Sequence, residues 1–383
     1  MPVDDEAQVN GDGAIRLLAA GFNGHHQLFA FDEDPRAFTA MVEAVATIPR
    51  NVLFAGWSNT VFQAGKHISS LGHQKLALVN LEDDRLMQCG FGDHEGIMGC
   101  IDHEGRLYLV EHPAIVEQSE LVERPDSPDQ ERHLLCQSTD VSPKIGTIAL
   151  AGNGRIALTF KQAPNGNLVH IAEFNSPLAF VRWFRDPSGE GNYPACHHMI
   201  PGRPKQLLAN TGSFILLMES GDVYTWGDAR YQSLGRAIGE EMPADKPGAV
   251  DALGGLSISK IASGGWMHAA LSADGALYVW GANSPGVEGR IRCLEDQDQV
   301  ALVTLPDPDA EPLDVLDMAI GDNHIAAVTE GDRMFVVGEN RNGQLGVGSE
   351  ERFIEDWVEV PNLTQVRKVW CGPKSTFVRT KAL

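Results

Sequence analysis

The chain has 383 residues, with 52 Asp and Glu against 30 Lys and Arg, and its formal net charge is −22. An acidic surface of this kind repels phosphate backbones, which argues against non-specific binding of DNA or RNA. The six cysteines are scattered without a C-x-x-C pair, which favours reduced, mostly buried thiols in a cytoplasmic or nuclear protein. No apolar run approaches the ~18 residues of a membrane helix.

The first 50 residues contain three predicted segments. Residues 1–13 are acidic and polar, so we expect a flexible tail and no secretory signal. Residues 14–30 include the apolar run IRLLAAG, which has the form of the second half of a hairpin without a first half. A short helix is predicted within residues 30–50, where four apolar residues have helical spacing, namely Phe38, Met41, Val42 and Val45.

A repeated hairpin occupies most of the remaining chain, and its clearest copy is Lys260–Gly281. Two apolar runs flank the turn signal SADG, and the second run alternates as in a half-buried strand. We call Gly281, which follows the second strand, the anchor glycine. Equivalent glycines follow the second strand in two other copies, Gly227 (281 − 227 = 54) and Gly338 (338 − 281 = 57). This regular spacing indicates a repeat protein.

Six internal units can be counted in this way, at about residues 51–75, 86–112, 145–175, 206–236, 258–285 and 316–348. Residues 366–380 match the first half of a unit, and residues 14–30 match the second half. Joined, the two halves make a seventh unit, and a ring closed in this way leaves no open edge. The sequence therefore predicts an all-β fold, a seven-bladed β-propeller closed by pairing its N- and C-terminal strands, as one domain over residues 14–383.

The residues that follow the anchor glycines resemble a known repeat. From Gly338, the sequence GENRNGQLGVG is similar to the WG-x-N-x-x-G-Q-L-G-x-G signature of the regulator-of-chromosome-condensation family. Decayed versions begin at Gly227 and Gly21. An A-x-G-x-x-H pattern before the second strand begins at Ala319 and, with one extra residue, at Ala262. Members of this family are seven-bladed propellers, so the resemblance implies the same fold as the count of units.

Long links separate several units. Residues 111–143 and 286–316 are acidic and contain proline, and we expect solvated loops there. Residues 186–205 form a link rich in Gly and Pro. In propellers such insertions leave the ring on its faces, where partners usually bind.

Adjacent histidines do not predict a metal site, because neighbours along a strand point to opposite faces. This applies to His25 with His26 and to His197 with His198. Another three histidines, His94, His268 and His324, lie near the first turn of three units. Either they form a ring of polar groups on one face, or each imidazole bonds to backbone within its own blade, which is the reading we favour. We expect no catalytic constellation, no metal and no cofactor.

Tryptophans divide into two groups. Trp226 and Trp280 occupy the same repeat position, which predicts a structural role. Trp57 and Trp266 follow glycines at the first turn of their units and could lie on a face, where aromatic side chains dominate interface hot spots. Within Arg182–Arg185, Trp183 predicts packing rather than an exposed patch.

Ten residues at the first turns are therefore the predicted partner-binding residues. They are Trp57, Asn59, Asp93, His94, Trp266, Met267, His268, Asp322, Asn323 and His324. The acidic charge favours a protein partner with a basic surface. We expect a non-enzymatic interaction scaffold or regulatory subunit, monomeric on its own, with neither nucleic acid nor membrane as partner.

The resemblance implies three kinds of partner. The chain looks like the small propeller that partners a JmjC-type oxygenase, and also like a fungal alpha-tubulin suppressor propeller that works with a small zinc protein. The founding member of the family exchanges guanine nucleotide on a Ran-type small GTPase. Nucleotide exchange on such a GTPase is therefore the alternative function.

Overall fold

A computed structural model describes the chain over residues 15–28, 37–43, 51–73, 76, 79–80, 86–110, 115, 133–139, 142–161, 166–295, 300–306, 313–363 and 365–381. The predicted tail at residues 1–13 lies outside these residues, as do most of the acidic link 111–143 and parts of the link 286–316.

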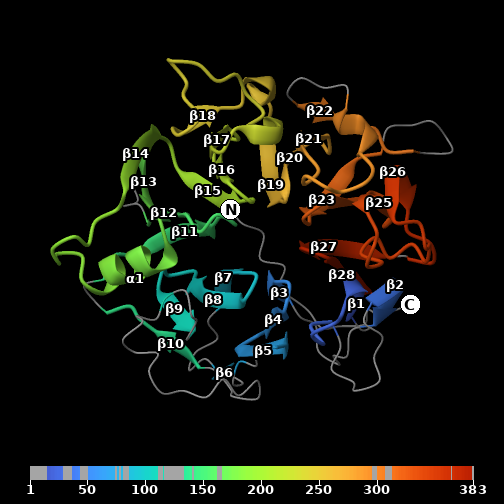
Figure 1. Cartoon of the computed structure of the whole chain (residues 1–383), viewed down its shortest axis with the longest axis horizontal. Helices are drawn as coiled ribbons and strands as arrows, with labels where there is room; N and C mark the ends of the chain where they lie inside the picture. The colour runs from blue at the N-terminus through green and yellow to red at the C-terminus, as the bar shows by residue number, and fades with distance from the viewer. Residues whose placement is uncertain are drawn as a thin grey trace.

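Seven four-stranded antiparallel sheets form the blades of a ring (Figure 1). We label the strands of each blade A to D from the axis outward. Blade 1 contains β3 (Asn51–Ala55), β4 (Asn59–Ala64), β5 (His67–Gly72) and β6 (Val79–Asn80). Blade 2 contains β7 (Met87–Asp93), β8 (Gly96–Asp102), β9 (Leu107–Val110) and β10 (Leu134–Cys136). Blade 3 contains β11 (Ile145–Leu150), β12 (Ile156–Phe160), β13 (Leu168–Phe174) and β14 (Cys196–Pro201).

The remaining four blades have the same order. Blade 4 contains β15 (Pro204–Ala209), β16 (Ser213–Met218), β17 (Val223–Gly227) and β18 (Gly248–Ala249). Blade 5 contains β19 (Ile258–Gly264), β20 (Trp266–Ser272), β21 (Leu277–Ala282) and β22 (Ala301–Leu302). Blade 6 contains β23 (Val315–Ile320), β24 (His324–Thr329), β25 (Met334–Glu339) and β26 (Phe353–Glu359). Blade 7 contains β27 (Val366–Gly372), β28 (Ser375–Lys381), β1 (Ile15–Phe22) and β2 (Ala37–Glu43).

The two ends of the chain close the ring in blade 7. Strand β1 pairs with β28 without a register shift, from Ile15 opposite Lys381 to Gly21 opposite Ser375. The inner strands contact one another all the way round, and β27 contacts β3. Figure 1 shows the blue β1 beside the red β28. The predicted seven-bladed ring, closed by strands from both ends, is confirmed.

Seven apolar clusters hold the ring together, and each lies between two neighbouring blades. The cluster between blades 4 and 5, for example, joins Ile215 and Val223 to Ile261 and Trp280. Burial of apolar surface contributes about 25 cal/mol per Å². Each blade is therefore stabilised by the two neighbouring blades that pack on its faces. A single blade could not bury these faces alone.

The helix predicted within residues 30–50 is wrong where the structure describes it. Residues 37–43 form strand β2, which pairs with β1. Its outer edge is covered, since Ala40 bridges Val347 and the N–H of Gly348 donates to the carbonyl of Thr39 at 2.7 Å. Tertiary pairing therefore overrides the local helical spacing.

Within the described residues the α-helix is α1 (Pro177–Arg185), in the C–D loop of blade 3. Its sequence has a clear start signal: Ser176 caps it by accepting from the N–H of Ala179, and Pro177 follows the cap. Trp183 is 8% exposed and packs on Phe174 at 5.2 Å between ring centroids. Short 3-10 turns occur at Arg230–Gln232, Asp251–Leu253 and Arg292–Leu294. The link 186–205 contains strand β14, the outer strand of blade 3.

Close packing and a positive φ angle both require glycine at the anchor positions. Gly281 has φ +98°, and a Cβ there would lie 2.2 Å from the carbonyl oxygen of Trp266. Gly338 has φ +112° and would meet the carbonyl oxygen of Asn323 at the same 2.2 Å. A side chain at either position would push the third strand away from the turn before the second.

All six cysteines are free thiols, but they are less buried than predicted. Cys100 is buried, Cys136 and Cys196 are exposed, and the other three are intermediate. Burial raises the pKa of the Cys89 and Cys371 thiols to about 12. No helix in the described part of the chain is long and apolar enough to cross a bilayer.

Candidate functional site: the AB face

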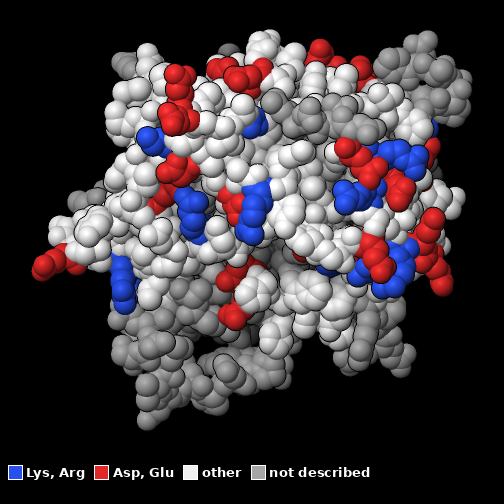
Figure 2. Space-filling view, turned by 45° about the horizontal axis from the view of Figure 1, so that its top comes forward, with Lys and Arg blue, Asp and Glu red and all other residues white. Residues whose placement is uncertain are grey.

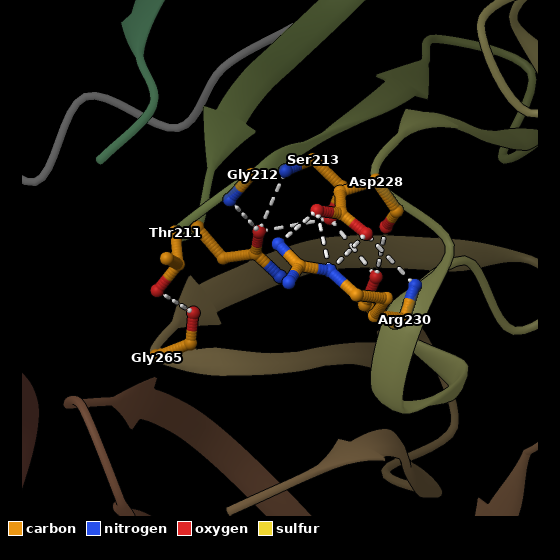
Figure 3. Close-up of polar contacts among 8 residues, drawn as sticks. Thr211, Gly212, Ser213, Asp228, Arg230 and Gly265 are labelled. Carbon is orange, nitrogen blue, oxygen red and sulfur yellow. Dashed lines mark hydrogen bonds and ion pairs between the residues drawn. The ribbon is translucent and has the colours of Figure 1, made fainter. Parts of the chain in front are cut away.

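The turns between strands A and B, together with the loops between strands C and D, lie on one face of the ring. We call it the AB face, and the face that carries the B–C turns the BC face. The AB turns are hydrogen-bonded to one another from blade to blade. The Asn153 N–H donates to the carbonyl of Thr211 at 2.8 Å, the Thr211 N–H to that of Gly265 at 2.9 Å, and the Asp322 N–H to that of Pro373 at 3.2 Å. The Thr211 hydroxyl also donates to the Gly265 carbonyl, and Figure 3 shows this second link. These contacts join the AB turns of blades 3, 4 and 5 to one another and the AB turn of blade 6 to that of blade 7.

The structure separates the ten predicted partner-binding residues into two groups. Six of them are buried: Asn59, Trp266, Met267, His268, Asn323 and His324. Four reach the surface of the AB face: Trp57, Asp93, His94 and Asp322. The first group is enclosed by the blades, whereas His94 is exposed and the other three members of the second group are partly exposed.

His268 and His324 occupy different register positions, although the sequence pattern groups them. His324 pairs with the anchor Gly338, whereas Met267 pairs with Gly281 and His268 comes one residue later. Because strand side chains alternate, this single step points the two imidazoles at opposite neighbouring blades. The extra residue is Gly265, which has φ +54°.

Both imidazoles are buried and bonded to side chains of other blades. The Nε2 atom of His268 lies 3.0 Å from the hydroxyl of Ser213 in blade 4. The Nε2 atom of His324 lies 3.1 Å from the hydroxyl of Thr376 in blade 7. Burial lowers both pKa values to about 3, so the rings are neutral. The prediction that each ring bonds to backbone within its own blade is therefore wrong, and the polar ring on the surface is also excluded for these two. His94 differs, because its side chain is 81% exposed.

Trp226 and Trp280 have the structural role that the sequence predicts. Each is buried and donates its indole N–H to the preceding blade, Trp280 to the carbonyl of Ser233 at 3.1 Å and Trp226 to Glu173 at 2.8 Å. Glu173, which the sequence did not single out, also accepts from His198 at 2.7 Å and pairs with Arg155. It joins strands of blades 3 and 4, and only the tertiary arrangement identifies it.

The AB turn of blade 5 is covered by the C–D loop of blade 4. The Arg230 guanidinium lies 5.0 Å above the ring of Trp266. It donates to both carboxylate oxygens of Asp228 (Figure 3). Tyr231 meets Trp266 edge-on at 4.9 Å between ring centroids. Tyr231 and Gln232 are consecutive non-glycine residues at φ +58° and +57°, a conformation that packing must impose. As a result Trp266 is only 7% exposed.

The AB turn of blade 1 has a different neighbour. Phe22, the last residue of β1 in blade 7, stacks on Trp57 with ring centroids 4.8 Å apart and planes at 21°. The Gln27 side chain donates to the carbonyl of Trp57 at 2.9 Å. His25 lies edge-on to Phe22 and 6.0 Å from His73, and its pKa is lowered by burial and by the other imidazoles. Both stacked rings remain partly exposed.

Several charged side chains lie together near the AB turns of blades 6 and 7. Glu339 accepts from Lys374 at 2.6 Å, and from the Asn323 amide at 3.2 Å. Burial raises the pKa of the nearby Asp322 carboxyl to about 6, with Lys374 acting in the opposite direction. Arg341 lies 3.4 Å from Glu288, whose side chain is 84% exposed.

Acidic and basic side chains are interspersed over the surface seen in Figure 2. Several are in ion pairs, such as Arg292 with Glu355 and Asp356 at 3.1 and 3.0 Å. Among the described residues, His, Cys, Asp and Glu side chains do not gather in a group of three or more that could hold a metal ion.

Comparison with known proteins identifies the repeat. A family model described as the regulator of chromosome condensation (RCC1) repeat matches residues 220–271, and a second model of the same description matches residues 315–344. RCC1 domain-containing protein 1 of Mus musculus is 28% identical over 222 residues, which are 48% of this chain and 58% of the mouse protein. The ultraviolet-B receptor UVR8 of Arabidopsis thaliana is 38% identical over 130 residues, 34% of this chain and 28% of the receptor. The chain thus spans less than two thirds of both relatives.

Solved structures match the whole ring. Human WBSCR16 superposes with a TM-score of 0.66 at 14% identity, covering 97% of this chain and 100% of that one. Prp20p from Saccharomyces cerevisiae gives a TM-score of 0.68 at 14% identity, covering 97% and 92%. At this identity the likeness concerns the fold alone.

Proposed function

Because the chain is a seven-bladed propeller with RCC1 repeats, we propose that it is a non-enzymatic interaction subunit that binds a basic protein partner through its AB face. The observation that carries this proposal is the AB face itself. Several of its turns are hydrogen-bonded to the turn of the next blade, and partly exposed aromatic and acidic side chains lie at the turns of blades 1, 2 and 6. A rigid surface with aromatic anchors loses little conformational entropy when a partner binds.

Charge supports the choice of a basic partner. The chain has a net charge of −22, and complementary charge accelerates encounter and disfavours wrong partners. On the AB face, Glu95 and Glu288 have side chains 48% and 84% exposed. The resemblance of the sequence gives three candidates to test first: a JmjC-type oxygenase, a small zinc protein and a Ran-type GTPase. We propose that the chain and such a partner act together in the cytoplasm or the nucleus.

The experiment captures partners on the tagged full chain at moderate salt and then repeats the binding with the purified partner. One variant reverses charge on the AB face, Glu95→Lys with Glu288→Lys. A matched control reverses two exposed acidic residues at B–C turns, Asp274→Lys with Glu330→Lys. We expect the first pair to weaken binding at least tenfold and the control pair to leave it within twofold.

Two results would overturn the proposal. Equal loss in both double variants would show that total charge, not the AB face, governs binding. Accelerated release of labelled GDP from a Ran-type GTPase, at catalytic amounts of the chain, would instead establish nucleotide exchange as the function.

A further inference from the structure

The AB face has one tryptophan that is covered, Trp266 at blades 4 and 5, and one that is partly exposed, Trp57 at blades 7 and 1. At blades 4 and 5 the chain supplies an arginine, Arg230, which covers Trp266 and bonds to Asp228. Arg230 lies three residues after the anchor Gly227. The same position in blade 6, after Gly338, is Arg341, and in blade 7, after Gly21, it is Gly24. Residues 23–28, the part of the blade 7 connection that the structure describes, therefore bring no arginine or lysine to the turn of blade 1.

The packing of blade 7 explains why this position is a glycine. A Cβ at Gly24 would lie 2.4 Å from the tip of the Phe22 ring, so a side chain there is incompatible with the stack of Phe22 on Trp57. The result is an aromatic pair that is partly open, where the corresponding pair at blades 4 and 5 is closed by a guanidinium.

Acidic groups lie beside this open pair. The hydroxyl of Ser58, which follows Trp57, contacts the carbonyl of His94 at 3.4 Å, so the AB turn of blade 2 adjoins that of blade 1. That turn carries Asp93 and Glu95, and the carboxylate of Asp93 accepts from the N–H of Glu95 at 2.8 Å. A cation over the aromatic pair would be attracted both by the rings and by the carboxylates of the adjoining turn.

We propose that Phe22 and Trp57, with Glu95 beside them, form the docking site for an arginine side chain of the basic partner. The partner's guanidinium contacts the exposed part of this aromatic pair, as Arg230 contacts Trp266 from within the chain at blades 4 and 5. Arginine fits better than lysine, because its planar group stacks on a ring while it donates to a carboxylate. This inference rests on the proposed function and specifies the contact through which it operates.

The test uses the full chain and a defined probe. A capped tetra-arginine peptide is titrated at 150 mM salt, followed by calorimetry and by tryptophan fluorescence, against a capped tetra-citrulline peptide of the same shape without charge. We expect the arginine peptide to bind at least tenfold more tightly. Trp57→Leu and, separately, Phe22→Leu should weaken it at least fivefold. Tyr193→Ala, at a tyrosine 73% exposed on blade 3, should leave it unchanged.

The outcomes separate this inference from the proposed function. Equal binding of both peptides, or full binding by folded Trp57→Leu and Phe22→Leu proteins, would overturn the arginine site. If the captured partner still depends on the charge pair Glu95 and Glu288 while Trp57→Leu has no effect on it, the interaction function stands and the arginine site fails. Dimerisation that Trp57→Leu abolishes would show that a second copy, not a partner's arginine, occupies the site.

Discussion

Trp266 and Trp57 both lie at AB turns, and both are contacted by the C–D connection of the preceding blade, but their surroundings differ. Trp266 is part of strand β20, opposite Ala282, and Arg230 and Tyr231 cover it. Trp57 precedes strand β4 and keeps part of its surface open beside Phe22. The Gly-Trp pair lies one residue further from the residue that pairs with the anchor glycine in blade 1 than in blade 5, and it serves the stability of the ring in blade 5 but offers a contact surface in blade 1. Repetition of a motif does not imply repetition of its role.

The largest difference between the two tryptophans should appear in stability. Trp266→Ala removes a buried ring between two blades and should lower the free energy of unfolding by about 3–5 kcal/mol. Trp57→Ala removes a partly exposed ring and should cost about 1–2 kcal/mol. Urea unfolding followed by circular dichroism measures both. Equal losses would mean that the exposed site is as structural as the buried one.

The anchor glycine beneath the Trp266 turn gives the next largest effect. Gly281→Ala places a methyl group against the Trp266 carbonyl, and should cost about 2–3 kcal/mol. Gly331→Ala is the matched control, because Gly331 has φ +83° but no atom within 4 Å of its Cβ position; it should cost about 1 kcal/mol. Thermal unfolding of the two variants separates the packing cost from the backbone cost. The same melting temperature in both would refute the role assigned to close packing.

The buried imidazole near Trp266 predicts a pH effect. The pKa of His268 is about 3 in the folded chain and about 6.5 in an unfolded one, so only the unfolded chain takes up its proton between these values. Stability should therefore fall as the pH drops below about 6.5, by about 1.4 kcal/mol per pH unit for each such imidazole, and His324 contributes in the same direction. Asp322, with its pKa raised to about 6, opposes this because the folded chain takes up that proton first.

The variant His268→Asn checks this pH effect by chemical unfolding between pH 7 and pH 4.5. The free energy of unfolding of this variant should fall less on acidification than that of the wild-type chain. The difference should equal the contribution of one buried imidazole. An unchanged slope would show that His268 is already protonated in the folded state.

The smallest effect on stability is expected for Arg230→Ala. The guanidinium is 66% exposed and its ion pair with Asp228 is screened by solvent, so the unfolding midpoint should stay the same. Iodide quenching of tryptophan fluorescence should nevertheless increase, because Trp266 loses its cover. Repeating the tetra-arginine titration should then reveal a second binding site. Unchanged quenching would show that Tyr231 alone shields Trp266.

Several features of this protein follow from the sequence alone. The spacing of Gly227, Gly281 and Gly338 indicates the repeat, and the half-units at the two ends indicate how the ring closes, because neither can bury its strands by itself. Trp226 and Trp280 are correctly predicted as structural residues, since a repeated aromatic residue at a fixed strand position packs against the same kind of neighbour.

Tertiary structure decides what local patterns leave open. Residues 37–43 become a strand because β1 and the loop of blade 6 provide partners, which helical spacing alone cannot reveal. One extra glycine, Gly265, turns His268 toward blade 4 while His324 faces blade 7, because side chains alternate along a strand. The choice between a covered and an open tryptophan depends on residues from the preceding blade, Arg230 in one case and Phe22 with Gly24 in the other. These contacts join residues more than 30 positions apart, and no local pattern specifies which blade faces which turn.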